Sequence, residues 1–136
     1  MRVVVDTNVL VSGLITSQGS SASIVNLILE GQLQPLTNLA IELEYREVLT
    51  RGKFHLDPQL VEFVLAHIHS VGERVNAQPV DDALPDPKDR PFLEVALSGW
   101  AEVLITGNKK HFPAKVRKGI KIMGPTEFLS FFVGEQ

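Results

Sequence analysis

The 136-residue sequence contains no cysteine, which excludes disulfides, zinc sites built from thiolates and cysteine nucleophiles. It also lacks an apolar run long enough to span a bilayer. The first residues show no basic segment followed by an apolar one, so we expect no signal peptide, a cytoplasmic location and no membrane association. Apolar residues make up 44% of the chain, enough for a hydrophobic core. The length favours one domain over residues 1–136.

The sequence also lacks a basic excess. Its 13 lysines and arginines stand against 16 aspartates and glutamates, for a formal net charge of −3. A protein that binds phosphates by bulk charge is expected to be basic, so this balance counts against simple electrostatic binding of nucleic acid. It does not count against binding through divalent metal ions, which reverse the local sign of charge.

The charges are distributed unevenly along the chain. Residues 81–89 contain four aspartates and one lysine. Residues 109–121 contain no acid and six basic residues: Lys109, Lys110, Lys115, Arg117, Lys118 and Lys121. One interpretation is a pair of solvated loops that differ in sign. The other is a metal site beside a track for phosphates. The charge pattern leaves both open.

Alternating apolar runs and amphipathic segments predict an α/β fold with a parallel sheet. Apolar runs bounded by turn residues predict strands, and amphipathic stretches with N-terminal capping residues predict helices. The predicted order is β-α-β-α-α-α-β-β-α, with strands at residues 2–6, 33–36, 103–106 and 120–123 and helices at residues 20–29, 38–51, 57–71, 87–99 and 126–133.

Two predicted strands end in polar residues that can form a site. Asp6 follows the first strand, and Thr106, Gly107 and Asn108 follow the third. Ligands of open parallel sheets bind beyond the carboxyl ends of the strands, so Asp6 and Asn108 are expected at one edge of the sheet. The alternative for Asp6 is a structural role, in which it caps the next turn together with Thr7 or Asn8.

Further acids lie on other predicted elements. Glu44 is near the apolar side of the second predicted helix, and its alternative role is a surface ion pair with Arg46 or Arg51. Asp89 lies in the first turn of the helix that follows the acidic loop, where a carboxylate is stabilised by the helix dipole alone. Asp86, just before Pro87, is the expected cap of that helix.

Three carboxylates on separate elements would suit a hard divalent cation. Mg²⁺ prefers oxygen ligands and keeps several waters, so two or three carboxylates and the phosphate oxygens of a substrate suffice. Such an ion polarises the phosphoryl group and activates water without any histidine. His111, in the basic stretch, is predicted either to contact phosphate or base, or to be a partly exposed loop histidine.

Five segments extend over nearly the whole chain: residues 3–13 (VVVDTNVLVSG), 44–54 (EYREVL followed by KF), 86–96 (DPKDRPFLEVA), 105–113 (ITGNKKHFP) and 122–129 (IMGPTEFL). Their order and spacing give the sequence a resemblance to the PIN-domain family. It implies a three-layer α/β/α fold with a central, mostly parallel sheet of four to five strands.

The resemblance also implies residue roles and a cofactor, Mg²⁺ or Mn²⁺. Asp6, Glu44 and Asp89 match the acidic metal-binding positions, and Asp86 is a neighbouring candidate. Asn8 and Thr106 match polar positions that support the site. Many members carry an aspartate where this chain has Asn108, whose amide oxygen can bind a metal but adds no charge.

The leading functional hypothesis is an endoribonuclease that cuts single-stranded RNA, with Lys109, Lys110 and His111 guiding the substrate. Small members of the family are toxins of toxin–antitoxin pairs, so the resemblance implies an antitoxin partner and a homodimer. A phosphatase of the haloacid-dehalogenase type would need a second aspartate where Asn8 stands. A PIN-like module that binds RNA or protein without cleavage remains the non-enzymatic alternative.

Overall fold

The computed structural model describes residues 1–135, in which five strands and seven α-helices form an α/β fold. The strands are β1 (Arg2–Val5), β2 (Gln34–Thr37), β3 (Glu73–Arg74), β4 (Val103–Ile105) and β5 (Lys121–Met123). The helices are α1 (Thr7–Ile15), α2 (Ser20–Leu29), α3 (Leu39–Leu49), α4 (Pro58–Val71), α5 (Arg90–Ser98), α6 (Ala114–Arg117) and α7 (Pro125–Gly134).

The strands form one parallel sheet in the order β3-β2-β1-β4-β5, with β1 at its centre. Val3, Val4 and Val5 are at most 1% exposed, which explains why β1 is apolar on both faces rather than alternating. Val5 pairs with Ile105 of β4. The residues that follow these two strands therefore start from the same level of the sheet.

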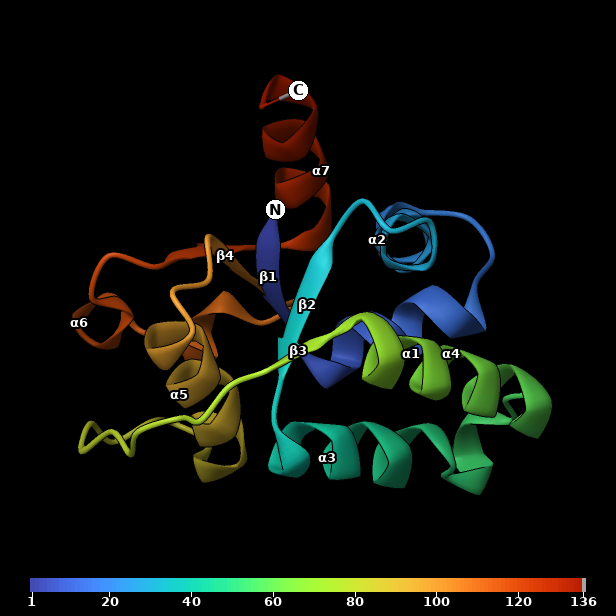
Figure 1. Ribbon diagram of the computed structural model, residues 1–136, viewed down its shortest axis with the longest axis horizontal. Helices are drawn as coiled ribbons and strands as arrows, with labels where there is room; N and C mark the ends of the chain where they lie inside the picture. Colours follow the sequence, from blue (N-terminus) through green and yellow to red (C-terminus); the bar gives the residue numbers. More distant parts are fainter. Residues whose placement is uncertain (136) are drawn as a thin grey trace.

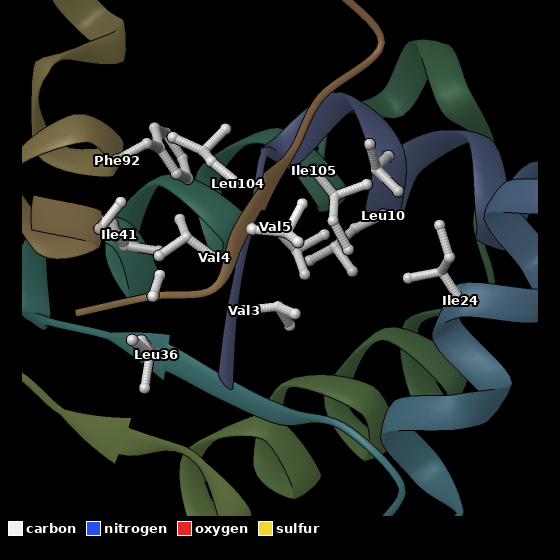
Figure 2. Packing of buried hydrophobic residues seen from close by; sticks show 14 of the residues in the cluster. Val3, Val4, Val5, Leu10, Ile24, Leu36, Ile41, Phe92, Leu104 and Ile105 are labelled. Carbon is white, nitrogen blue, oxygen red and sulfur yellow. The ribbon is translucent and has the colours of Figure 1, made fainter. Parts of the chain in front are cut away.

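Helices cover both faces of the sheet, as the three-layer prediction requires. Helices α5 and α6 lie on one side, whereas α1, α2 and α4 lie on the other (Figure 1). Val4 faces Phe92 of α5 and Ile41 of α3, and Val5 faces the side of Leu10 and Ile24 (Figure 2). The two apolar layers hold the central strand rigidly between them.

Helix α3 lies across the carboxyl edge of the sheet, below the ends of β1 and β2 in Figure 1. It begins after Asn38, whose side chain accepts a hydrogen bond from the Ile41 N–H, as a capping residue does. The buried Tyr45 hydroxyl donates a hydrogen bond to the carbonyl of Val5. This contact fixes α3 directly against the end of the central strand.

Helices α1 and α2 pack closely because of one glycine. A Cβ atom at Gly13 would lie 2.7 Å from the carbonyl oxygen of Ser21 and 2.7 Å from Cγ2 of Val25. Any larger residue would push the two helices apart, and α1 carries the residues that follow Asp6.

Three elements were not predicted from the sequence: α1, β3 and α6. Helix α1 is apolar around most of its circumference, with Val9, Leu10 and Val11 all buried, so it shows no amphipathic period. Strand β3 has two exposed polar residues and is recognisable only by its pairing with β2. The last helix begins at Pro125 rather than after Thr126, since the Glu127 side chain accepts a hydrogen bond from the Gly124 N–H.

Among residues 1–135 there is no helix of the length and apolar character needed to cross a membrane.

Candidate metal centre

Asp6 lies at the carboxyl end of β1 and is 5% exposed. Its backbone N–H donates to the carbonyl of Ile105, which ties it to β4. Its Oδ2 accepts a hydrogen bond of 2.7 Å from the hydroxyl of Thr106, and the same hydroxyl accepts one from the Asn108 N–H. Although Asp6 precedes α1, its side chain makes no cap hydrogen bond. The hydroxyl of Thr106, rather than a cap hydrogen bond, therefore holds this carboxylate oxygen in place.

Glu44 comes from α3 and approaches the same strand end. The buried Thr7 hydroxyl donates a hydrogen bond to Glu44 Oε2. Its predicted alternative as a surface ion pair is wrong, because the arginines nearby are used by other acids. Arg46 pairs with Glu62, and Arg51 pairs with Glu47. Glu44 thus faces the end of β1 without a cationic partner of its own.

The segment before α5 supplies Asp86 and Asp89. Asp86 Oδ1 accepts a hydrogen bond from the Lys88 N–H, as expected of a residue that caps the turn at Pro87–Asp89. Asp89 is 8% exposed. Its Oδ2 lies 2.7 Å from His111 Nδ1, yet this shielded oxygen has no partner with hydrogen-bond geometry among the residues that the structure describes.

The segment after β4 supplies His111. Its ring is one-third exposed, and its Nε2 lies 2.8 Å from Asn108 Nδ2. Potential ligand atoms of Asp86, Asp89 and His111 all lie within 4.8 Å of one another. The histidine that was predicted to contact RNA is therefore also part of the acidic cluster.

The two buried aspartates resist ionisation. Burial raises the pKa of Asp6, and hydrogen bonds from Thr106 and the Thr7 backbone offset this only in part. Burial and the charge of Asp6 raise the pKa of Asp89 to about 6, although His111 opposes the shift. Buried carboxylates repel one another when ionised, and a bound divalent ion would balance their negative charge. The oxygen-rich donor set fits Mg²⁺ or Mn²⁺, and so does Asp89 Oδ2, whose 2.7 Å contact with His111 Nδ1 lacks hydrogen-bond geometry.

These side chains open into one pocket of about 820 Å³. It is lined by Asp6, Glu44, Asp86, Asp89 and His111 and by the predicted support residue Asn8, whose Oδ1 lies 3.4 Å from the Gly107 N–H. The lining also includes residues that sequence analysis did not predict: Thr7, Val11, Ser12, Leu43, Glu47, Val48, Arg51, Phe54 and Lys88. Only the position of Thr7, next to Asp6, gave a signal that could have identified it.

The predicted phosphate track lies largely outside this pocket. Lys109 pairs with Glu127, and Lys118 pairs with Asp82 of the acidic loop. Lys109, Lys110 and Asn108 are not among the lining residues. Two exposed cations do line the pocket, Lys88 and Arg51, of which Arg51 is paired with Glu47.

Comparison with known proteins agrees with this geometry. The family described as PIN domain matches residues 2–110. The uncharacterized protein MJ1680 of Methanocaldococcus jannaschii is 29% identical over 112 residues, which cover 80% of this chain and 72% of the relative. This chain belongs to the PIN-domain family. PIN domains are typically nucleases that use divalent metals, and a cluster of Asp86, Asp89 and His111 that could hold a metal ion is present here.

Proposed function

We propose that this protein is a Mg²⁺- or Mn²⁺-dependent endoribonuclease that hydrolyses phosphodiester bonds of single-stranded RNA. The observation that supports it best is the convergence of Asp6, Glu44 and Asp89 on one pocket from three distant segments. Asp86 adds a fourth carboxylate at the same place. A bound divalent ion would polarise the phosphoryl group and favour ionisation of water at neutral pH.

The chain's own residues orient this site. Thr106 fixes the carboxylate of Asp6, and Thr7 fixes that of Glu44, so two of the three acids are held by buried hydroxyls. Such orienting contacts keep ligands in one geometry and reduce the reorganisation needed when a substrate binds.

The other lining residues suit a single strand of nucleic acid. Phe54, Val48 and Leu43 form an apolar wall on which an unpaired base can stack. Lys88 places positive charge at the same pocket, where it can contact the phosphate backbone, whereas the charge of Arg51 is paired with Glu47. A paired duplex would keep its bases stacked inside and could not use this wall.

The proposed biological role is that of the toxin in a toxin–antitoxin pair. It is supported by the resemblance to small toxin nucleases of the family. An antitoxin could block the site by placing an arginine among the carboxylates. We also propose a homodimer, to be tested by light scattering, and an antitoxin gene beside this one.

The test is cleavage of labelled single-stranded RNA in Mn²⁺ by wild type and by Asp6→Asn. The variant should lose at least about 10²-fold in rate, since it removes one charge from the centre of the site. Glu42→Gln is the matched control, because Glu42 is also held by a buried threonine but lies outside the pocket. Equal rates for wild type and Asp6→Asn would exclude the proposal.

The non-enzymatic alternative is a PIN-like module that binds RNA or protein without cutting. The absence of a charge at Asn108 is the observation that favours it. Calorimetric titration separates the two, because a nuclease must bind Mn²⁺, whereas an inert module would show no binding at millimolar concentration.

A further inference from the structure

His111 is the one nitrogen donor in the acidic cluster of the described residues. It follows β4 in the 3₁₀ turn Lys109–His111, and its Nδ1 points at Asp89 Oδ2 from 2.7 Å. An imidazole and a carboxylate at this separation can share one metal ion, since adjacent ligand atoms around a cation lie about 3 Å apart when each bond is about 2.1 Å.

Asp89 needs such an ion. Its side chain is 11% exposed, and Oδ2 has no hydrogen-bond donor with acceptable geometry in residues 1–135. A buried carboxylate oxygen left in this state is costly unless a ligand completes it. The donor atoms of Asp86 and His111 lie around the same place, so an ion there would satisfy all three groups at once.

Asn108 allows His111 to change between its two neutral tautomers. In the tautomer with the proton on Nδ1, Nε2 accepts a hydrogen bond from the Asn108 amide at 2.8 Å. When a metal takes Nδ1, the proton must move to Nε2. Rotation of the amide by half a turn then presents Oδ1 as the acceptor of that N–H. Metal-binding histidines nearly always donate their second N–H in this way.

We propose that His111 Nδ1, with Asp86 and Asp89, forms a mixed nitrogen–oxygen metal site that selects Mn²⁺ over Mg²⁺, and that Asn108 is its positioning residue. The inference rests on the metal-dependent function proposed above. Imidazole binds first-row transition ions, of which Mn²⁺ is the weakest binder, whereas Mg²⁺ keeps to oxygen ligands. Asn108 would then act through His111 rather than as a metal ligand itself.

The decisive measurement is pulsed electron paramagnetic resonance of the full chain loaded with Mn²⁺ alone. A directly bound imidazole nitrogen gives a characteristic ¹⁴N coupling, and we expect it in the wild type. His111→Ala should remove the coupling. His69→Ala is the matched control, because His69 is exposed and interacts with Glu42 outside the pocket, so its coupling should match wild type.

Calorimetry measures the selectivity. His111→Ala should weaken Mn²⁺ binding by about tenfold or more and leave Mg²⁺ binding nearly unchanged, so that the preference disappears. Asn108→Ala should weaken Mn²⁺ binding by about 10–100-fold, as loss of an orienting partner does, whereas Asn108→Asp should restore it because a carboxylate accepts the same N–H.

The possible outcomes separate this inference from the nuclease proposal. Bound Mn²⁺ without ¹⁴N coupling in the wild type would overturn the mixed site and leave the nuclease intact. Coupling without RNA cleavage would support the mixed site and overturn the nuclease. No Mn²⁺ binding at all would overturn both. The wild-type spectrum decides the matter even if a variant fails to fold.

Discussion

Asp6 and Glu42 are carboxylates in similar settings with opposite electrostatic surroundings. Each accepts a hydrogen bond of 2.7 Å from a buried threonine at a strand end, Thr106 for Asp6 and Thr37 for Glu42. Burial would raise the pKa of both. For Glu42, hydrogen bonds from His69, Thr37 and Arg74 outweigh burial and lower the pKa. Asp6 has no comparable cation, and its pKa stays raised.

The difference separates an acid whose negative charge the fold neutralises from one whose charge the fold leaves largely unbalanced. Around Glu42 the protein supplies its own positive charge. Around Asp6, Glu44 and Asp89 it supplies other carboxylates and one histidine. A cluster like this lowers the stability of the metal-free fold, and the binding of an ion would return that stability.

The largest effect should come from Asp89→Asn. In the folded protein the pKa of Asp89 is raised from 3.8 to about 6. Protonation of Asp89 therefore adds to the free energy of unfolding, and this addition is complete below about pH 4 and lost as the pH rises through 6. In chelator at pH 7, the variant should be more stable than wild type by about 1–3 kcal/mol. Urea unfolding between pH 4 and 7 should show this gap widening with pH.

Glu42→Gln is the control with the opposite sign. The pKa of Glu42 is lowered in the folded protein. The ionised side chain therefore adds to the free energy of unfolding above its unfolded pKa, and this addition is lost as the pH falls through the folded pKa. The variant should be less stable than wild type at pH 7, with a gap that closes on acidification. Parallel pH profiles for the two variants would contradict the comparison.

The next effect concerns the threonines. Thr106→Val removes the hydroxyl that holds Asp6 and accepts from Asn108 N–H, and should lower the free energy of unfolding by about 1–3 kcal/mol. It should also weaken Mn²⁺ binding by about 10–100-fold. Thr37→Val should cost similar stability with no change in Mn²⁺ affinity by calorimetry. A Thr106 variant with unchanged affinity would show that Asp6 needs no orientation.

The smallest effect is expected from Arg74→Met. It removes one cation from Glu42 while His69 and Thr37 remain. The pKa of Glu42 should rise, and stability at neutral pH should fall by roughly 0.2–1 kcal/mol, as for other exposed pairs. Carboxyl NMR titration of Glu42 measures the shift. An unmoved pKa would mean that His69 and Thr37 outweigh burial by themselves.

Most of the fold could be predicted from the sequence because it depends on local patterns. Buried strands such as β1 and β4 are continuous apolar runs, and helices α3 and α4 carry capping residues at Asn38 and Asp57. The prediction that Asp6 and Asn108 lie at one edge followed from a general property of parallel sheets, in which strand ends share an edge. Helix α1 could not be predicted, because its buried surroundings come from α2 and α3.

The surroundings of the site were less predictable. That Thr7 would hold Glu44, or that His111 would lie beside Asp89, depends on how distant segments pack. The lysine-rich stretch shows the limit most clearly. Its composition left a phosphate track and a solvated loop both open, and in the structure Lys109 and Lys118 pair with acids that are distant in sequence. Charge composition predicts a local excess, and only the tertiary structure shows which charges are already neutralised.

The hydrogen bond between Thr106 and Asp6 joins residues 100 positions apart. It can form only after β4 has been inserted beside β1, and parallel pairing over such a separation is among the slower events in folding. During synthesis, a ribosome-bound chain that ends before β4 has Asp6 without the strand that fixes it. The pocket is completed only when the segment that follows β4 has emerged and folded.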